Sequence, residues 1–179
     1  MTKIYYIRHG QSEDNLAGLT SGAERDAALT DEGRAQAKAA GQALRGKQVD
    51  LIVCSPMQRA AETARIVAGE IGYDPTHIIE RKEFVERFMG TYSGVPHEEY
   101  RQANESGNMD ESLETTKSMF DRASSGLEWL HGHPAENIVV VAHGGIGRAV
   151  WAVDQKRDHS EMYKREGFNN AEIYELTLE

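Results

Sequence analysis

The sequence predicts an α/β fold with three layers, α/β/α, in which helices cover both faces of a mainly parallel central sheet. Short apolar runs at 4–7, 50–54 and 138–142 lack polar alternation, which is typical of strands buried on both faces. Helical patterns alternate with these runs along the chain. With 179 residues and 39% hydrophobic content, the chain is long enough for one core, so we expect a single domain over 1–179.

Helices are expected where apolar residues recur at three- and four-residue steps between capping signals. Thr30 is a predicted N-cap, and Pro56 is expected at the first position of the following helix, where its missing N–H costs nothing. Gly33 is a poor residue for the first turn, since a capping box favours Glu or Gln there. The predicted helices cover residues 30–44, 56–72, 98–103, 111–131 and 146–153.

The remaining segments are read as loops and short strands. Residues 12–28 are polar and rich in glycine, which favours a loop that folds over a ligand, and 80–96 has a similar loop composition. A short third strand is expected at 78–79. Residues 173–178 alternate between apolar and polar, which predicts a final edge strand.

Composition excludes several classes of function. The formal net charge of −9 argues against nucleic acid or an anionic membrane as the main partner, although a local cationic pocket can still take a small anion. Cys54 is the only cysteine, so neither an intramolecular disulfide nor a cysteine-rich zinc site is expected. No run of apolar residues reaches membrane-spanning length and no signal-peptide pattern opens the chain, so we expect a cytoplasmic location.

Three predicted strands end in similar chemistry. In a parallel sheet the carboxyl ends of the strands lie on one edge, where ligands bind in open α/β sheets. Guanidinium groups bind phosphate in a bidentate manner, and free N–H groups at a helix start would complete a cradle for an anion with several oxygens. The residues at these three ends are Arg8, His9 and Gly10; Ser55, Pro56 and Arg59; and His143, Gly144 and Gly145.

These segments resemble the histidine phosphatase superfamily, the phosphoglycerate-mutase-like group, along the chain from residue 4 to the last strand. The matching motifs, in order, are Arg8-His9-Gly10 with Ser12 and Asn15, Leu29-Thr30 with Gly33 and Ala37, Ser55-Pro56 with Arg59-Ala60 and Glu62-Thr63-Ala64, the segment Glu86 to Gly94, His143-Gly144-Gly145, and Asn170-Ala171. Tyr92-Ser93 stands where the family often has Trp-Glu.

The resemblance implies roles for individual residues. His9 would be the nucleophile that becomes a phosphohistidine, and Glu86 would be the proton donor, with Glu83 as a nearby alternative. Asn15 would fix the phosphate or the adjacent loop. The implied catalytic residues are His9, Glu86 and His143, and the implied phosphate-binding residues are Arg8, Asn15, Arg59 and Gly144, with His143 also contacting phosphoryl oxygens.

The implied function is hydrolysis of a small phosphorylated metabolite through a phosphohistidine intermediate, with no cofactor and no metal, because two arginines and a second imidazole neutralise the phosphoryl charge. A cofactor-dependent phosphoglycerate mutase is the alternative, and a non-catalytic phosphate-ester binding module is a third hypothesis. Only 56 residues separate Glu86 from His143, which is short for the family's mutases and favours hydrolysis. We expect selectivity to reside in the segments 17–28 and 88–109, for which the sequence names no substrate; oligomeric state also stays open.

Two other motifs in the sequence suggest different functions. Cys54 and Arg59 suggest a cysteine phosphatase loop, but four residues lie between them and Pro56 removes an N–H donor, so a buried structural cysteine is favoured. The glycines at 145 and 147 suggest a dinucleotide loop, but Val150 occupies the third small position. His97 follows the Glu86 segment and could reach the substrate.

Overall fold

The central sheet has five strands in the order β3-β2-β4-β1-β5. The computed structural model describes residues 1–107 and 109–179; Asn108, within the predicted selectivity segment, lies outside the described residues. Strand β4 pairs in parallel with β1 and β2, β2 pairs in parallel with β3, and β5 is antiparallel to β1, as expected for an edge strand. The strands are β1 (Thr2–Arg8), β2 (Leu51–Cys54), β3 (Ile79–Glu80), β4 (Asn137–Ala142) and β5 (Ile173–Leu178).

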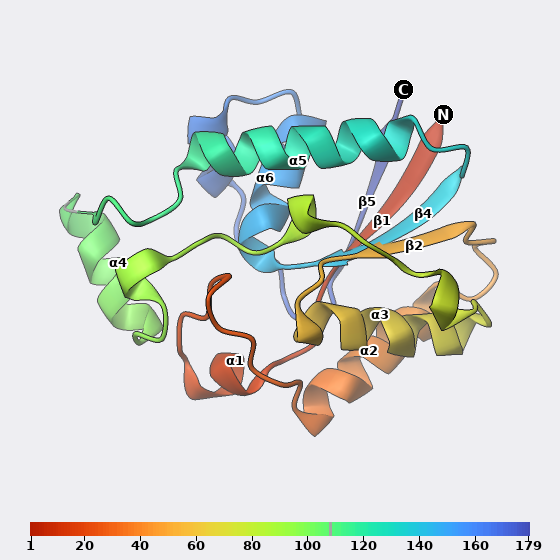
Figure 1. Cartoon of the computed structure of the whole chain (residues 1–179), viewed down its shortest axis with the longest axis horizontal. Coiled ribbons are helices and arrows are strands. Elements are labelled where there is room, and N and C mark those ends of the chain that lie inside the picture. The colour runs from red at the N-terminus through yellow and green to blue at the C-terminus, as the bar shows by residue number, and fades with distance from the viewer. Residues whose placement is uncertain (108) are drawn as a thin grey trace.

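Helices cover both faces of this sheet, which confirms the predicted three-layer architecture (Figure 1). Helices α2 (Asp31–Ala43) and α3 (Gln58–Ile71) lie on one face, and α5 (Thr116–His131) and α6 (Gly144–Asp154) lie on the other. Two shorter helices, α1 (Glu13–Ala17) and α4 (His97–Ser106), lie beyond the end of the sheet at which β1 finishes. Short 3-10 turns occur at Pro75–His77, Lys82–Phe84, Gly90–Tyr92 and His159–Lys164.

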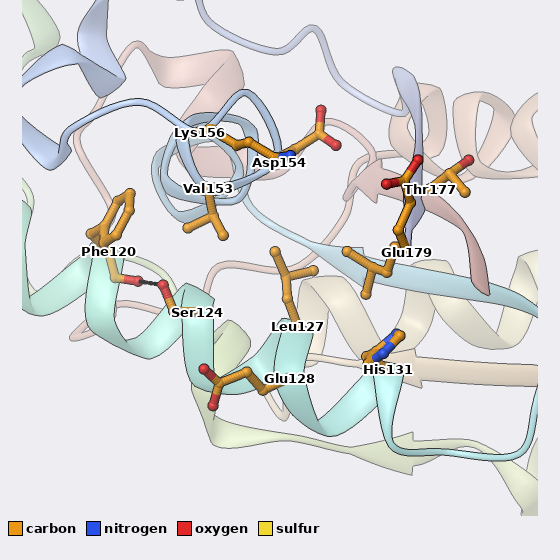
Figure 2. A pocket seen from close by; sticks show the side chains of 11 residues that line it. Phe120, Ser124, Leu127, Glu128, His131, Val153, Asp154, Lys156, Thr177 and Glu179 are labelled. Carbon is orange, nitrogen blue, oxygen red and sulfur yellow. Dashed lines mark hydrogen bonds between the residues drawn. The ribbon is translucent and has the colours of Figure 1, made fainter. Parts of the chain in front are cut away.

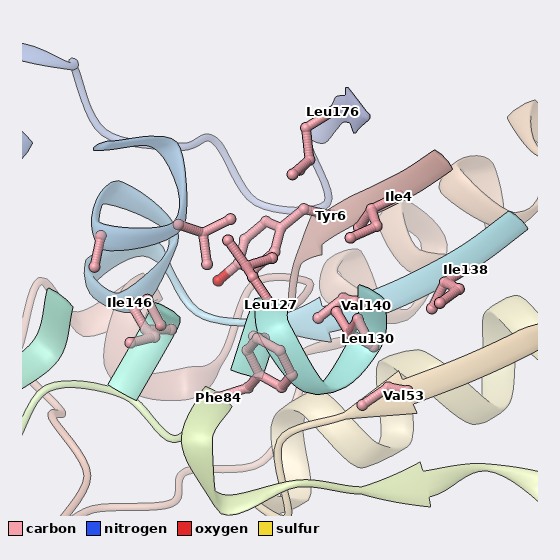
Figure 3. Packing of buried hydrophobic residues seen from close by; sticks show 14 of the residues in the cluster. Ile4, Tyr6, Val53, Phe84, Leu127, Leu130, Ile138, Val140, Ile146 and Leu176 are labelled. Carbon is pink, nitrogen blue, oxygen red and sulfur yellow. The ribbon is translucent and has the colours of Figure 1, made fainter. Parts of the chain in front are cut away.

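Each face of the sheet has its own hydrophobic cluster. Along β1, Ile4 and Tyr6 point into the cluster below α5 and α6, whereas Tyr5 and Ile7 point into the cluster below α2 and α3. Figure 3 shows Tyr6 in the first cluster, among side chains from the neighbouring strands and helices. Fully burying a large apolar side chain contributes roughly 1.5–3 kcal/mol, so burial on both faces fixes the strand ends that carry the polar residues.

Helix α3 starts later than predicted. It begins at Gln58, and Pro56 is not its first residue; Met57 occupies the N-cap and provides no side-chain hydrogen bond. The reason is local, because the Ser55 hydroxyl accepts the Met57 N–H at 3.3 Å and closes a turn there instead.

Helix α5 also starts later than predicted, at Thr116 rather than at residue 111. Its N-cap is Thr115, whose hydroxyl accepts the Ser118 N–H at 3.1 Å. Just before it, Glu114 pairs with Arg122 at 2.8 Å and accepts the Phe88 N–H at 3.1 Å, contacts made from outside the helix. These tertiary contacts explain why the helical pattern of the sequence is not followed to its start.

The predicted loop over 12–28 contains helix α1, which the sequence analysis missed. Ser12 and Asn15 form a reciprocal capping box around its first turn. Five residues are too few to show a helical period, so only the cap could have revealed this helix. Helix α6 likewise begins at Gly144 rather than 146, which places the two glycines of the His143 motif in its first turn.

Candidate active site

The three expected strand ends meet at one edge of the sheet, since β4 lies between β1 and β2. Arg8 ends β1, Ser55 follows β2, and His143 follows β4 and is the N-cap of α6. A cavity of about 200 Å³ opens there. Its lining includes five of the predicted site residues, Arg8, His9, Asn15, Arg59 and Glu86.

His9 is buried and is held as a neutral imidazole. Its Nδ1 donates to the carbonyl of Gly10 at 2.6 Å; a carbonyl only accepts, so the proton is on Nδ1 and the lone pair is on Nε2. The Arg59 Nε–H donates to that Nε2 at 3.2 Å. Burial, then the charges of Arg59 and Arg8, lower the His9 pKa well below 6.5. The Nε2 of the ring is therefore unprotonated at neutral pH, and its lone pair accepts from Arg59.

His143 lies against His9, with the ring centroids 5.2 Å apart in an edge-to-face arrangement; it is fully buried and is not among the residues that line the cavity. Its Nε2 bonds to the Ser55 hydroxyl at 2.8 Å, and its Nδ1 has no hydrogen-bond partner in the described part of the chain. Burial and then the Arg59 charge lower the pKa of His143 well below 6.5. The backbone of His143 is also held, because the Tyr6 hydroxyl donates to the His143 carbonyl at 2.7 Å.

The two predicted arginines are held differently. Arg8 donates through one Nη to the Phe168 carbonyl, while its buried Nε has no partner among residues 1–107 and 109–179. Arg59 is fully buried on the first turn of α3 and forms an ion pair with Asp26 at 3.2 Å. Burial lowers the pKa of both guanidinium groups, which nevertheless stay protonated near neutrality.

Asn15 and Gly144 support this group. The Asn15 Oδ1 accepts from the Ser12 N–H and from the Asn170 side chain, both at 3.1 Å, so its amide N–H₂ is directed elsewhere while its oxygen faces the capping box. A Cβ on Gly144 would lie 3.5 Å from the Arg8 Nε, in ordinary contact. Gly144 therefore lies beside the arginine, not in the cavity lining.

Glu86 lies on the cavity, whereas its sequence rival Glu83 does not. The Glu86 carboxylate accepts the N–H groups of Arg87 at 2.7 Å, Gly145 at 2.9 Å and Ile146 at 3.0 Å. A Cβ at Gly145 would come within 2.4 Å of this carboxylate, so an added side chain would shift the carboxylate from its present position. Glu83 pairs with Arg81 at 2.7 Å and lines other surface hollows.

The first turns of α3 and α6 both bind carboxylates of the protein. The sequence predicts free N–H groups at such helix starts for a bound anion. Instead, Glu86 binds the first turn of α6, and Asp26 binds the first N–H groups of α3. A carboxylate from a neighbouring loop satisfies the same donors and the same helix dipole as a phosphate would. These N–H groups of Gly145, Ile146, Gln58 and Arg59 already have an acceptor within the protein.

Several cavity residues were not predicted from the sequence, because they lie outside the strand-end motifs themselves. Arg87 donates to the hydroxyls of Tyr163 at 2.5 Å and Tyr100 at 3.2 Å, and Arg148 lies over the Tyr163 ring at 5.1 Å. The buried Thr20 hydroxyl lacks a partner among the described residues. His97, singled out as a residue that could reach substrate, also lines the cavity.

The rival readings have no support at this site. Burial raises the pKa of the Cys54 thiol to about 12, so it is not a nucleophilic thiolate. A hollow of about 650 Å³ between α5, α6 and β5 has Glu128, Asp154 and Glu179 around it and only Lys156 as a cation, which does not suit an anion (Figure 2). Within the described ranges, no set of three or more potential ligands is placed to hold a metal ion, and no helix is long and apolar enough to cross a membrane.

Comparison with known proteins places the chain in a family. The profile of the histidine phosphatase superfamily (branch 1) matches residues 4–179. Uncharacterized phosphatase PhoE of Bacillus subtilis is 34% identical over 84% of this chain and 76% of its own length. A 2,3-bisphosphoglycerate-dependent phosphoglycerate mutase of Mesorhizobium japonicum is 30% identical over 98% of this chain and 93% of its own.

A solved structure has the same fold. Phosphoserine phosphatase of Entamoeba histolytica, in complex with 3-phosphoglyceric acid, superposes with a TM-score of 0.81 at 26% identity, over 98% of this chain and 90% of its own. The family profile, the curated relatives and this fold all indicate the same superfamily. The chain therefore belongs to the histidine phosphatase superfamily, as an enzyme of the phosphatase kind.

Proposed function

We propose that this phosphatase hydrolyses phosphomonoesters of small metabolites, with His9 as the nucleophile. The His9 Nε2 forms a bond to phosphorus while the bond from phosphorus to the ester oxygen breaks, and a proton from the Glu86 carboxyl goes to the leaving alkoxide. Substrate must first displace the Arg59 Nε–H from the His9 lone pair. Arg59 is then free to donate to a phosphoryl oxygen.

The second step reverses the roles. Water attacks phosphorus, Glu86 takes its proton, and the bond between phosphorus and Nε2 breaks with its electron pair returning to His9. The Ser55 hydroxyl accepts the Met57 N–H and has its own proton to give to the His143 Nε2, which leaves the His143 proton on Nδ1. We infer that this Nδ1–H donates to a phosphoryl oxygen.

The observation that carries the proposal is a pair of buried donors without acceptors. The Arg8 Nε and the His143 Nδ1 have no partner in the part of the chain that the structure describes, and a buried polar group left unpaired costs roughly 1–3 kcal/mol. Both belong to residues next to the His9 ring or in its strand end. A phosphoryl group bound at His9 would supply oxygens to both.

The cavity favours a substrate with a second negative group. Arg87 and Arg148 line it together with Arg8 and Arg59, which is more positive charge than one phosphate needs. Phosphoserine and 3-phosphoglyceric acid, named with the similar Entamoeba histolytica structure, carry a carboxylate near the phosphate ester. We propose substrates of this kind, and we expect O-phosphoserine or 3-phosphoglycerate to be hydrolysed faster than glycerol phosphate.

The test of the nucleophile uses His9→Ala. Wild-type enzyme mixed with a radiolabelled phosphate ester should yield an acid-labile, base-stable phosphoenzyme, and His9→Ala should yield none and lose turnover of an aryl phosphate. Circular dichroism and thermal unfolding serve as folding controls. Near-normal turnover by a folded His9→Ala protein would refute the assignment.

A phosphoglycerate mutase is the second candidate, supported by the Mesorhizobium japonicum relative, which matches this chain over 98% of its length. Incubation with 3-phosphoglycerate, with and without 2,3-bisphosphoglycerate, separates the two functions. A phosphatase releases inorganic phosphate, whereas a mutase produces 2-phosphoglycerate only when the bisphosphate is present.

We also propose that catalysis needs no metal ion and that the enzyme is cytoplasmic, as the sequence predicts.

A further inference from the structure

Asp26 lies outside the cavity lining, yet it contacts the phosphate-binding arginine and the helix that carries it. Its carboxylate accepts the Gln58 N–H at 2.5 Å and the Arg59 N–H at 3.4 Å, and it pairs with the Arg59 Nη1 at 3.2 Å. The Asp26 side chain is 37% exposed, whereas that of Arg59 is 2% exposed. An accessible loop residue thus makes three contacts with one buried residue and its neighbour.

Helix α3 depends on this loop for its capping. Its own N-cap, Met57, has no side chain that can accept a hydrogen bond. Asp26 takes that function from 32 positions away in the chain, and its negative charge suits the positive end of the helix. Because Arg59 is the second residue of α3, the same carboxylate fixes both the backbone and the guanidinium group of this arginine.

The guanidinium of Arg59 is oriented by what its outer donors contact. The Nη1 donates to the Arg25 carbonyl at 2.7 Å and to Asp26, and the Nη2 donates to the Gly22 carbonyl at 3.0 Å. With both Nη1 protons used, the edge formed by Nε and Nη2 is the one turned toward His9, as the bond from Nε to the His9 Nε2 shows.

The loop segment is itself anchored. Arg25 makes two hydrogen bonds of 2.9 Å to the buried Asp14 carboxylate, and the Arg25 hydrogen bonds lower the pKa of Asp14. Asp14 belongs to α1, which directly follows the His9 strand end. The loop that holds Arg59 is therefore tied to the same strand end that carries the nucleophile.

We propose that Asp26 is a positioning residue for phosphoryl binding: it holds the Nε–Nη2 edge of Arg59 toward His9 through the guanidinium and the first turn of α3. The proposal rests on the function proposed above only in that the ligand of Arg59 is a phosphoryl group. Misplacing a binding group by about 1 Å can cost about 100-fold in rate, so the carboxylate matters although it touches no substrate.

The test is a double-mutant cycle with Asp26→Ala and Arg59→Ala, measured as orthovanadate affinity by calorimetry and as kcat/KM for an aryl phosphate. In the wild-type background, Asp26→Ala should weaken vanadate binding and lower kcat/KM by about 10- to 100-fold. In the Arg59→Ala background, Asp26→Ala should have no further effect on either quantity, since it acts through Arg59. Additive losses, or no loss from Asp26→Ala alone, would overturn the proposal.

Asp50 offers a matched control. Its exposed carboxylate also accepts two backbone N–H groups, of Glu136 at 3.1 Å and Asn137 at 2.8 Å, but at the opposite end of the strands. Asp50→Ala should lower the unfolding temperature and leave vanadate affinity unchanged.

Asp26→Asn serves if Asp26→Ala fails to fold, because the amide keeps an acceptor for the N–H groups of α3. This variant should still weaken vanadate binding, because the ion pair with Arg59 is lost. Wild-type affinity in Asp26→Asn would contradict the proposal.

The outcomes also separate this inference from the proposed function. Vanadate binding needs no turnover, so the cycle can be completed even if no phosphate ester is hydrolysed. A wild-type protein that binds vanadate but forms no phosphohistidine would reject the catalytic proposal alone. A wild-type protein that forms phosphohistidine, with vanadate affinity insensitive to Asp26→Ala, would reject the positioning role alone.

Discussion

His9 and His143 show how burial selects a protonation state. Both rings are enclosed and face the charges of Arg8 and Arg59, so both are held neutral with pKa values well below 6.5. For His9 this keeps the nucleophilic lone pair available below neutral pH. The lowered pKa values also make folding stability depend on pH. In acid, the two imidazoles bind protons in the unfolded chain but stay neutral in the folded protein.

We predict that the free energy of unfolding falls as the pH is lowered below about 6.5. The folded-state pKa values are depressed, so this stability is fully present above the unfolded value and is lost as the pH drops toward the folded values. Each buried imidazole contributes up to about 1.4 kcal/mol per pH unit in that window. Urea unfolding at several pH values measures it.

The control for this prediction is a pair of single variants. His143→Asn should flatten the pH dependence, whereas substitution of the exposed His131 by Asn should leave the slope as in the wild type. A wild-type slope in His143→Asn would mean that other groups cause the acid instability.

Glu86→Gln should slow esters with poor leaving groups more than activated ones. The amide keeps an acceptor for the first turn of α6 but has no proton to give to an alkoxide. Loss of a general acid costs about 100- to 10,000-fold, so alkyl phosphates should fall by about that factor and p-nitrophenyl phosphate by much less. Steady-state kcat values for the two esters give the comparison.

Glu83→Gln is the matched variant, since Glu83 pairs with Arg81 away from the cavity. It should leave the ratio of the two kcat values unchanged. Equal losses on both esters in Glu86→Gln would point to another acid.

At the scale of elements, the position of His9 depends on the contact between the residues that follow β1 and the first turn of α2. A Cβ on Gly10 would lie 2.1 Å from the Gly33 carbonyl oxygen, and a Cβ on Gly33 would lie 2.1 Å from the Gln11 carbonyl oxygen. The two glycines let the strand end and the first turn of α2 touch through their backbones. Gly33, a poor residue for a capping box, is thus required by packing against the strand end. At Gly10, the absence of a side chain lets the backbone of α2 approach.

Gly10→Ala should destabilise the protein and displace the nucleophile. Overpacking of this kind costs typically 1–3 kcal/mol, and a shift of the strand end carries His9 out of line with Arg59. We expect a lower unfolding temperature together with a large loss of kcat/KM. Thermal unfolding and aryl phosphate turnover measure the two effects.

Gly69→Ala provides the comparison, because Gly69 lies inside α3 and no atom of the other described residues, apart from its chain neighbours and the helix backbone, would be within 4 Å of the added Cβ. That variant should gain roughly 0.5–1 kcal/mol of stability from helix propensity and keep its activity. Full activity in Gly10→Ala would show that the strand end tolerates displacement.

At the scale of the whole molecule, charge is distributed unevenly. The chain has a formal net charge of −9, yet Arg8, Arg59, Arg87 and Arg148 line the cavity, and Glu86 is the one carboxylate among the described lining residues. Concentrating cations around one small cavity strengthens their field at the phosphoryl group although the net charge of the chain is negative. The fold achieves this by bringing four separate segments to one edge of the sheet.

These arginines lead us to predict catalysis that is insensitive to chelators. The guanidinium groups and His143 offset the phosphoryl charge in the role that a metal ion fills in other phosphatases. Turnover of an aryl phosphate after prolonged EDTA treatment and desalting should match that of untreated enzyme. A loss that added Mg²⁺ or Mn²⁺ restores would show that a metal takes part.

The sequence pattern alone predicts the layers of the fold. It also predicts that Arg8, His9, Arg59 and His143 lie near one another. Buried parallel strands must finish on a common edge, so residues that follow them converge whatever the loops do. The start of α3 and the start of α5 were predicted wrongly, since side chains from elsewhere fix those turns.

Other features depend on packing between distant segments. Three contacts cannot be predicted from hydrophobic periodicity. They are the contact of Glu86, rather than Glu83, with the cavity; the contact of Asp26 with the first turn of α3; and the backbone contact of Gly10 with Gly33. They arise from loops, whose side-chain directions are set by the neighbours that they meet after folding. Hydrophobic periodicity can place the ends of strands, but it holds no information on which loop carboxylate reaches which helix.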